Sequence, residues 1–413
     1  MCLENELRSD TAMLIQFSVE NFRSFKDKVV FSMLASKDDA HPESMVLFGE
    51  KDRFLKSCVV YGANASGKSN LLSALWFMVS YVLSSHEKQL NLPTGRIPFK
   101  FDADTMKRDT SFEVIFTCES VKYAYGFSMN DKEVTEEYLY HYPHGRKALI
   151  FERTNTTKYR FTTDVDLQQN LKERNSRNKL YLSTAANWNY DKVVPVFNWF
   201  SSCLFLNQNT YGQAYGANAE SLQDDDYRSK IAGMLRAADF GIHGLRYRKG
   251  NVSFSGALQG VYDNIDAVHH VIDKSGDTQV YSLNMAEESN GTNAYLDLIG
   301  LVYKTLESGG IFVADEIDAH LHPLLTEQIV ALFNSEKSNP KNAQLVFTTH
   351  NTNLLDLDIL RRDQIWFTEK DEQTSVSELF SLDDYSVRKD AKVEKKYLLG
   401  RFGAIPVFRG GLL

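Results

Sequence analysis

A glycine-rich stretch with one lysine and one serine lies between two apolar segments. Residues 62–69 read Gly-Ala-Asn-Ala-Ser-Gly-Lys-Ser and follow the apolar run 57–61. A strand, a G-x-x-x-x-G-K-S loop and a helix in this order bind phosphate, because the glycines let successive N–H groups point into one concavity. The next apolar run, 71–83, predicts the helix, whose N-terminal dipole favours an anion. The alternative interpretation is a glycine-rich turn that happens to precede a helix. The rest of the sequence must decide between the two interpretations.

The chemistry of such a loop assigns roles to its residues. We expect the Lys68 ammonium to reach the β- and γ-phosphates of ATP and the Ser69 hydroxyl to bind Mg²⁺. The residues predicted to contact the nucleotide here are Gly62, Ala63, Asn64, Ala65, Ser66, Gly67, Lys68, Ser69 and Asn70.

Two acids follow a second apolar segment. Residues 309–314 predict a buried parallel strand, and Asp315 and Glu316 come directly after it. Ligands of open α/β sheets bind at the carboxyl ends of the strands. We therefore expect Asp315 to hold Mg²⁺ through water and Glu316 to act as the general base that polarises the attacking water. A strand that ends in a solvated acidic turn is the alternative, and the phosphate loop makes it the weaker one.

Further polar residues stand at the ends of predicted elements. Ser289 and Gly291 precede a helical run, 293–306, where a hydroxyl, free N–H groups and a dipole meet an anion. In most proteins such a serine is simply a helix cap. His350 follows the apolar strand 344–349, and a neutral imidazole there can contact the γ-phosphate. His320 and His322 lie two apart, but without a third ligand nearby they do not indicate a zinc site.

The remaining chain supplies the elements that must position these residues. The sequence predicts two strands within 14–31, an irregular surface segment at 32–56 and antiparallel strands within 91–161. The antiparallel strands include one hairpin of 111–117 with 122–128 and another of 147–153 with 157–162. Predicted helices cover 166–179, 188–205, 224–238 and 324–334, and a mixed strand region covers 243–280. No repeat and no long heptad register is visible, so we expect a globular insertion and not a rod.

Composition excludes several classes. The 413 residues carry a net charge of −8, which argues against a basic coat for nucleic acid but allows a local basic face. The four cysteines form no C-x-x-C pair, so neither zinc nor a disulfide framework is indicated. Residues 1–12 lack the apolar core of a signal peptide and read as an extension, and no apolar run is long enough to span a bilayer. We expect a cytoplasmic protein without membrane contact.

The ordered set of motifs resembles the ABC-type ATPase heads of the RecF, SMC and OLD group. Within that group it is most similar to stand-alone bacterial ATP-binding proteins of phage-defence and abortive-infection systems. The matching segments are 21–25, 62–69, 288–292, 311–318, 321–323, 348–351 and 400–406. The resemblance implies an α/β fold: a P-loop NTPase head of the ABC type with a mixed sheet core, an antiparallel β subdomain and a helical insertion.

The same resemblance implies a division of the chain into four parts. These are an N-terminal part of the ATPase core with the phosphate loop (1–85), the β subdomain (86–163), the helical insertion (164–240) and the C-terminal part of the core (241–413).

It also implies roles for single residues. Arg23 would contact the nucleotide, and His350 would be the switch histidine. Ser289 and Gly291 would form a signature motif that serves the ATP of the opposite protomer, and 318–320 would lie in a loop crossing between protomers. The implied machine is a head-to-tail homodimer with two sandwiched ATP molecules.

Two features depart from the usual pattern of the group. The segment Ser289-Asn290-Gly291 lacks the leading Leu and trailing Gln of the usual ABC signature. The glutamine that contacts the metal in many relatives is represented by two candidates, Gln168 and Gln208, and neither is favoured.

Three functions remain open at this stage. The first is an ATPase whose dimer gates a separately encoded effector such as a nuclease or toxin in phage defence, because only about 60 residues follow His350 and the acid run 224–226 reads as a solvated helix start. The second is a RecF-like clamp that grips DNA, with candidate contacts, equally readable as an ordinary solvated face, at Arg174, Arg177, Lys179 and 246–249. A transporter's ATPase subunit fits the motifs less well.

Overall fold

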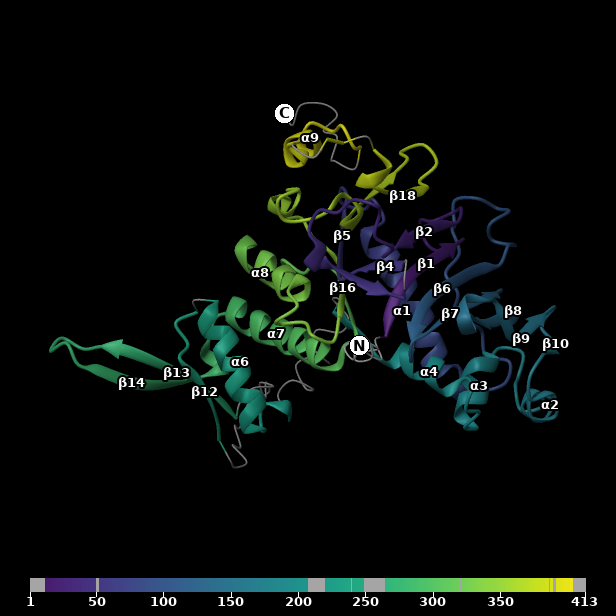
Figure 1. Ribbon diagram of the computed structural model, residues 1–413, viewed down its shortest axis with the longest axis horizontal. Helices are drawn as coiled ribbons and strands as arrows, with labels where there is room; N and C mark the ends of the chain where they lie inside the picture. The colour runs from purple at the N-terminus through teal and green to yellow at the C-terminus, as the bar shows by residue number, and fades with distance from the viewer. Residues whose placement is uncertain are drawn as a thin grey trace, which may run out of the picture.

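Two large sheets with helices between and around them make up the body of the protein (Figure 1). The computed structural model describes residues 12–49, 52–206, 220–238, 240–248, 264–319, 321–385, 387–388 and 391–403. Six strands form a mostly parallel sheet, in the spatial order β11 (Cys203–Leu206), β15 (Ile311–Ala314), β16 (Gln344–Thr348), β5 (Ser57–Tyr61), β17 (Ile365–Lys370) and β18 (Ser377–Ser381). Only β18 runs antiparallel to its neighbour.

The parallel strands form because their sequences are apolar on both faces. Every residue of β5, β15 and β16 is buried, as expected for strands covered on two sides. The predicted strands at 57–61, 309–314 and 344–349 are therefore confirmed. Their carboxyl ends, at Tyr61, Ala314 and Thr348, lie at one edge of the sheet because the strands are parallel.

Seven antiparallel strands form the second sheet. In spatial order they are β10 (Lys158–Phe161), β9 (Ala148–Thr154), β8 (Val134–His141), β7 (Val121–Met129), β6 (Thr110–Cys118), β1 (Met13–Glu20) and β2 (Val29–Ser32). Both predicted hairpins are present, whereas β8 was not predicted. Strand β1 pairs with β6 and β2 pairs with β1, so the sheet unites residues from both ends of the 13–161 segment.

Helix α1 (Lys68–Ser84) lies between the two sheets. Its Phe77 ring stacks on Phe112 of β6 with centroids 5.3 Å apart, and Tyr81 stacks on Phe127 of β7 at 5.9 Å. Helices α3 (Tyr181–Asn187) and α4 (Val194–Ser201) contribute to the same core. Helix α2 (Val165–Lys172) is shorter than predicted, and the predicted helix 188–205 is α4 followed by strand β11.

The other face of the parallel sheet is covered by α7 (Asn290–Ser308) and α8 (Pro323–Asn334). Helix α6 (Asp225–Ala237), as predicted, packs against α7, and α9 (Val393–Leu398) joins the same core. The 3-10 helices are η1 (Pro42–Ser44), η2 (Ser85–Glu87), η3 (Pro143–Gly145), η4 (Met285–Glu287), η5 (Thr352–Leu354), η6 (Arg362–Gln364) and η7 (Leu382–Asp384).

The expectation of an irregular surface segment at 32–56 was wrong. This part contains the hairpin of β3 (Met45–Phe48) and β4 (Asp52–Leu55), and Met33, Phe54 and Leu55 are fully buried. The segment is rich in charged residues, which concealed the few apolar ones that anchor it. Because β4 ends just before β5 begins, the hairpin lies at the amino edge of the parallel sheet.

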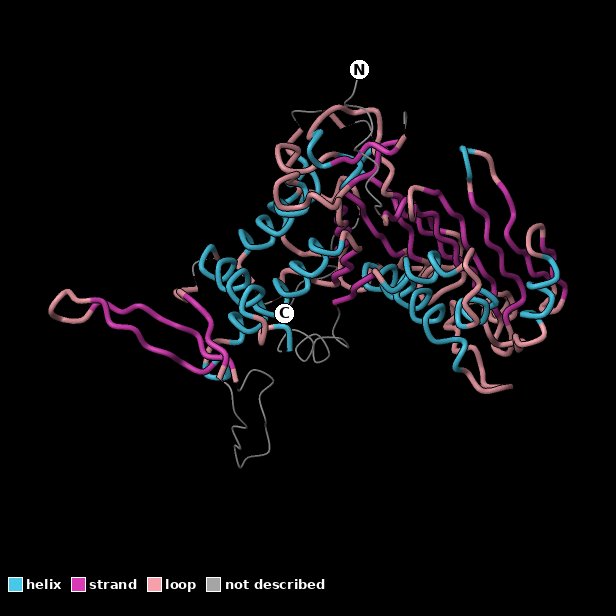
Figure 2. Tube along the Cα trace, turned by 60° about the horizontal axis from the view of Figure 1, so that its bottom comes forward, coloured by secondary structure: helices cyan, strands magenta, loops and turns pink. Residues whose placement is uncertain are grey.

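A three-stranded sheet packs against α6 at the margin of the body. It consists of β12 (Gly244–Tyr247), β13 (Ile265–Ile272) and β14 (Thr278–Asn284), and the β13–β14 hairpin projects into solvent (Figures 1 and 2). Its last strand leads through η4 directly to Ser289 at the start of α7. Within the described ranges, no helix is both long and apolar enough to cross a membrane.

Candidate nucleotide site

The loop at 62–67 connects β5 to α1 at the carboxyl edge of the parallel sheet. Gly62 has no room for a side chain, because a Cβ there would lie 2.4 Å from Ser66 Oγ and 2.6 Å from the Thr368 carbonyl oxygen. Gly67 has a φ of +123°, and its Cβ would lie 2.8 Å from Ser377 Oγ. Both glycines are thus required by close packing against β17 and β18 as well as by the curl of the loop.

Lys68 is folded back along this loop. Its Nζ donates hydrogen bonds to the carbonyl oxygens of Gly62 (2.7 Å) and Ala63 (3.2 Å), and its side chain is largely buried. Burial lowers the pKa of Lys68, while the carboxylates of Glu316 and Asp315 act in the opposite direction. The two carbonyl oxygens therefore hold the Lys68 ammonium at the opening of the loop, and a bound anion could replace them as its partners.

The phosphate loop and the acids after β15 meet, although they lie far apart in sequence. Ser69 Oγ donates to Asp315 Oδ1 at 3.1 Å, and Thr348 Oγ1 donates to the same oxygen at 2.7 Å. Hydroxyl and carboxylate oxygens are ligands that suit Mg²⁺. The residues at this point therefore fit a magnesium ion, with Ser69 and Asp315 as the groups that would hold it directly or through water.

Glu316 occupies an unusual backbone position beside these ligands. Its φ is +52°, in the left-handed region, and its N–H donates to Thr348 Oγ1 at 2.7 Å. The carboxylate oxygen Oε1 lies 3.9 Å from Nε2 of His350, and both side chains are about half exposed. His350 is fixed through its backbone N–H, which donates to Asp318 Oδ2 at 3.2 Å. A carboxylate and an imidazole thus face each other at the open edge of the site.

Arg23 reaches the loop from a different part of the chain. It lies in the turn after β1 with a φ of +49°, and its guanidinium approaches Asn70 Oδ1 at 3.4 Å. Asn70 in turn donates to Ser24 Oγ at 2.7 Å. The turn at 21–25 is therefore docked on the first turn of α1, next to the phosphate loop.

Three hydroxyls that support the site carried no motif of their own. Thr348 joins Asp315 to the backbone of Glu316, Thr368 Oγ1 lies 2.7 Å from Ser66 Oγ, and Ser377 Oγ donates to the Ser66 carbonyl at 2.6 Å. Thr348 could have been found from its place at the end of a buried strand. The other two depend on β17 lying beside β5 and β18 lying beside β17, which the sequence does not indicate.

The residues of the signature are not brought to this site within one chain. Ser289 caps α7 by accepting a hydrogen bond from the Thr292 N–H at 3.1 Å, and it is exposed. Helix α7 has 19 residues and spans about 28 Å, and its other end leads into β15. Among the described residues, no hydrogen bond or ion pair links 289–291 to the loop at 62–70.

Other sequence candidates have structural roles or lie outside the described residues. Gln168 is buried, and its amide donates to the Thr163 carbonyl (2.7 Å) and the Ile150 carbonyl (3.2 Å), far from the phosphate loop in the fold. His322 caps α8. The structure describes neither Gln208 nor His320 nor the segments 1–11 and 404–406. In the ranges that it does describe, no cluster of three His, Cys, Asp or Glu residues could hold a metal.

The basic residues considered for DNA are engaged within the protein. Arg177 pairs with Glu133 at 3.3 Å, the Lys179 ammonium donates to the His86 carbonyl at 2.7 Å, and Arg248 pairs with Asp266 at 3.1 Å. The first two follow α2 and the third follows β12, and these elements lie at opposite ends of the molecule (Figure 1). They do not form one basic face. Lys249 lies outside the described residues.

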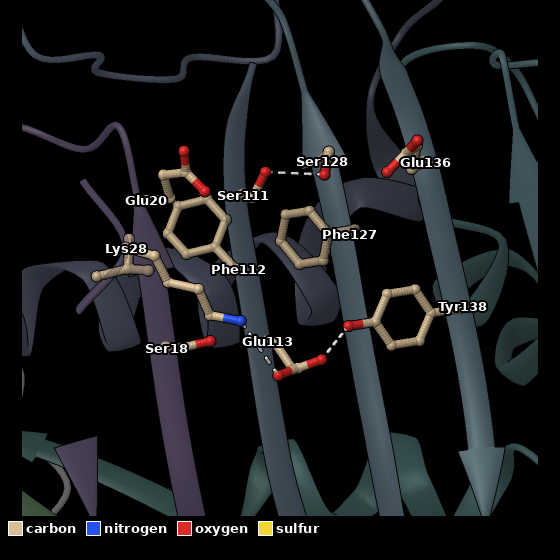
Figure 3. Close-up of a pocket in the computed structure, with 11 residues that line it drawn as sticks. Ser18, Glu20, Lys28, Ser111, Phe112, Glu113, Phe127, Ser128, Glu136 and Tyr138 are labelled. Atoms are coloured by element: carbon tan, nitrogen blue, oxygen red, sulfur yellow. Dashed lines mark hydrogen bonds and ion pairs between the residues drawn. The ribbon is translucent and has the colours of Figure 1, made fainter. Parts of the chain in front are cut away.

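A hollow of about 180 Å³ elsewhere does not compete with this site (Figure 3). It lies on the antiparallel sheet, across β1, β6, β7 and β8. Lys28 Nζ lies 3.7 Å from Glu113, Tyr138 donates to the same carboxylate, and Ser111 and Ser128 bond each other at 2.9 Å. These polar groups satisfy one another, and the hollow contains no glycine-rich loop.

The fold and the site together define a class of protein. A parallel sheet whose central strand leads through a G-x-x-x-x-G-K-S loop into a buried helix, with acids at the end of a neighbouring strand, is the arrangement of P-loop nucleotide-binding proteins. The antiparallel sheet packed on α1 agrees with the ABC-type head expected from the sequence.

The family described as "AAA domain, putative AbiEii toxin, Type IV TA system" matches residues 58–356, well over half of the chain. The chain belongs to this family. It accordingly carries an AAA domain and is related to the AAA proteins of abortive infection, as the sequence predicted. No curated protein matches its sequence.

Solved structures with similar folds share little sequence with the chain. The SMC head domain from Thermotoga maritima is 14% identical to this chain, with a TM-score of 0.42. The match covers 89% of this chain and 98% of that domain. An SMC head bound to the C-terminal winged-helix domain of ScpA is 14% identical (TM-score 0.36; 89% and 97% covered). RecF with ATP is 13% identical (TM-score 0.35; 91% and 100% covered).

Proposed function

We propose that the protein binds ATP with Mg²⁺ at the phosphate loop and hydrolyses the terminal phosphoanhydride bond in a head-to-tail homodimer. The contact between Ser69 and Asp315 carries this proposal, because it places a magnesium-type ligand pair at the mouth of the loop. The bound ion would supply positive charge to the phosphate oxygens. Dimer closure and reopening would then gate a partner protein in the cytoplasm.

Each residue of the chain has a defined task in this proposal. Backbone N–H groups of 62–69 and the Lys68 ammonium bind phosphate oxygens and fix their orientation. Glu316 accepts a proton from the attacking water, and His350 contacts the γ-phosphate and registers its loss. Arg23, in the turn after β1, approaches Asn70 in the first turn of α1, and both are assigned to the end of the nucleotide away from the γ-phosphate. Thr348 positions Asp315 and Glu316 through one hydroxyl.

Thr348→Val tests this positioning role. Removing the hydroxyl leaves the Glu316 N–H without its acceptor and frees the Asp315 carboxylate, so we expect turnover to fall on the order of 10- to 100-fold. The Mg²⁺ concentration for half-maximal turnover should rise, which a merely structural role would not cause. Thr348→Ser should restore both values. Thr326→Val is the matched control, since this buried hydroxyl has no hydrogen-bond partner among the described residues. Wild-type magnesium dependence in Thr348→Val would contradict the assignment.

The dimer is supported by the position of Ser289 and Gly291. They are at the exposed end of a helix of about 28 Å, and among the described residues no hydrogen bond or ion pair joins them to the phosphate loop of their own chain. A helix N-terminus with free N–H groups suits a phosphate. A second copy, related by a twofold axis, would bring this end to the open edge of the site, where Glu316 and His350 are half exposed.

Complementation between two inactive variants tests the shared site. Ser289→Arg should block closure while leaving ATP binding by the monomer intact, and Lys68→Ala should lose ATP. In an equal mixture, heterodimers contain one intact composite site, so we expect up to about a quarter of wild-type turnover. Ser308→Arg, at the opposite end of α7, is the matched control. If the signature acted within its own chain, the mixture would stay inactive.

The partner is proposed to be a separately encoded effector, such as a nuclease or toxin, in anti-phage defence. The family description names a toxin of a toxin–antitoxin system, which fits control of a growth-arresting output. The β13–β14 hairpin could transmit the nucleotide state, since His269 Nε2 lies 2.8 Å from Glu288, the residue before Ser289. The buried free thiols at Cys58, Cys118 and Cys203 suit a reducing cytoplasm. A RecF-like DNA clamp is less well supported, because two of its candidate basic residues, Arg177 and Arg248, form ion pairs within the chain.

A further inference from the structure

We propose that Phe101 is the platform on which the base of the nucleotide stacks, with Lys370 beside it at the same end of the site. This inference rests on the proposed function, because it concerns the far end of the same nucleotide. It assigns a task to a large aromatic side chain that is 73% exposed.

The direction of the nucleotide follows from the order of the strands. Asp315 and Glu316 both follow β15. Strands β15 and β16 lie on one side of β5. The terminal phosphate belongs on that side, next to the general base. The rest of the nucleotide must extend along the loop to the other side, where β17 pairs with β5 and where Arg23 approaches Asn70. The base is therefore expected near the turn at 21–25.

The segment carrying Phe101 is fastened to this turn by several contacts. The Arg23 N–H donates to the Ile97 carbonyl at 2.8 Å, and the Lys26 ammonium pairs with Asp102 at 2.6 Å. The Asn21 amide donates to the Thr105 carbonyl at 2.7 Å. An exposed ring held by a fastened loop loses little conformational freedom when a ligand stacks on it, which favours binding.

Lys370 connects Phe101 to the phosphate loop. Its ammonium lies 6.0 Å from the centroid of the Phe101 ring, and its backbone pairs in register with Ser377. Ser377 Oγ donates to the carbonyl of Ser66 inside the loop. Within the described residues Lys370 makes no ion pair, so its charge is available to a phosphate or to the stacked base.

The neighbouring aromatic residue, Phe99, is buried, whereas Phe101 is exposed. Phe99 is 1% exposed, and its ring meets Phe101 at 5.7 Å and 74°, in an edge-to-face contact. Phe99 thus anchors the loop, while most of the Phe101 side chain is exposed. Stacking of a base on an aromatic side chain tolerates any base but strengthens binding markedly.

Binding of ADP and of inorganic tripolyphosphate to the full-length chain tests the proposal. ADP avoids hydrolysis, and tripolyphosphate has no base. We expect Phe101→Ala to weaken ADP binding on the order of 10-fold, because stacking contributes at this scale, and to leave tripolyphosphate affinity unchanged. Leu47→Ala is the matched control, because Leu47 is equally exposed (75%) but belongs to the hairpin at the amino edge of the sheet.

A second variant reports stacking directly. Phe101→Trp should keep ADP affinity, and its added fluorescence should be quenched by ADP but not by tripolyphosphate. Unchanged ADP affinity in Phe101→Ala, or equal losses for both ligands, would overturn the platform. Unchanged ADP affinity with weaker ATP-dependent dimerisation would overturn it too and assign Phe101 to the interface. If wild type bound neither ligand, the proposed function itself would fail, which is a different result.

Discussion

Lys68→Ala should bind ATP at least two orders of magnitude more weakly than wild type. The lysine is the only side-chain cation inside the described loop at 62–69, and hydrogen bonds from a charged donor to an anion are among the strongest in proteins. Its ammonium already sits in the mouth of the loop, held by the carbonyls of Gly62 and Ala63. Removing it takes away the positive charge that attracts the negatively charged triphosphate. Calorimetric titration with a non-hydrolysable ATP analogue measures the effect.

Lys179→Ala is a stringent control for this loss. Lys179 is also partly buried, and its ammonium donates to the His86 carbonyl at 2.7 Å. Lys68 donates to the Gly62 carbonyl at the same distance. Both variants lose the same kind of hydrogen bond, so any shared destabilisation appears in both melting curves. Only Lys68→Ala should lose nucleotide. Wild-type ATP affinity in a folded Lys68→Ala protein would show that the loop binds no phosphate.

The sequence sufficed for the residues at the ends of buried strands. Ser69 and Asp315 are far apart in the chain, yet Ser69 ends the loop after one apolar run and Asp315 directly follows another. The carboxyl ends of neighbouring parallel strands share one edge, so these residues had to meet wherever the strands became neighbours. The contact between Ser69 and Asp315 is the consequence.

The parts that the sequence could not supply depend on strand order and on buried charge. Thr368 and Ser377 support the loop only because β17 lies next to β5 and β18 lies next to β17. Strand β8 escaped prediction because Glu137 interrupts its apolar pattern. This glutamate is fully buried, accepts hydrogen bonds from the N–H groups of Tyr181 and Leu182 at the start of α3, and has its pKa raised by burial. No local pattern reveals a carboxylate that accepts hydrogen bonds from backbone N–H groups 44 and 45 residues further along the chain.

The division into domains shows the same limit. The boundary at residue 85 separates the phosphate loop from the predicted β subdomain, but β1 pairs with β6 across it. Long-range pairing of this kind brings the turn at 21–25 to the start of α1, and hence Arg23 to Asn70. The four segments remain a proposal about folding units, whereas the pairing explains how the first strands help to build the site.

Glu316→Gln should bind ATP as tightly as wild type but turn it over 10²- to 10⁴-fold more slowly. Loss of a positioned general base has this scale of effect. The amide keeps the size of the side chain and leaves the N–H bond to Thr348 in place, so the left-handed backbone at φ +52° and the rest of the site should persist. Single-turnover kinetics separate the chemical step from binding.

The same variant should also accumulate as a dimer when ATP is present. If hydrolysis is what opens the proposed interface, a chain that closes on ATP and cannot cleave it stays closed, and light scattering should report twice the monomer mass. Glu327→Gln is the matched control, since this acid of α8 contacts Asn353 at 3.2 Å and has no part in the site. Dimerisation with unchanged turnover would assign the base to another residue. Slow turnover without a dimer would instead leave Glu316 as the base and remove the second copy from the mechanism.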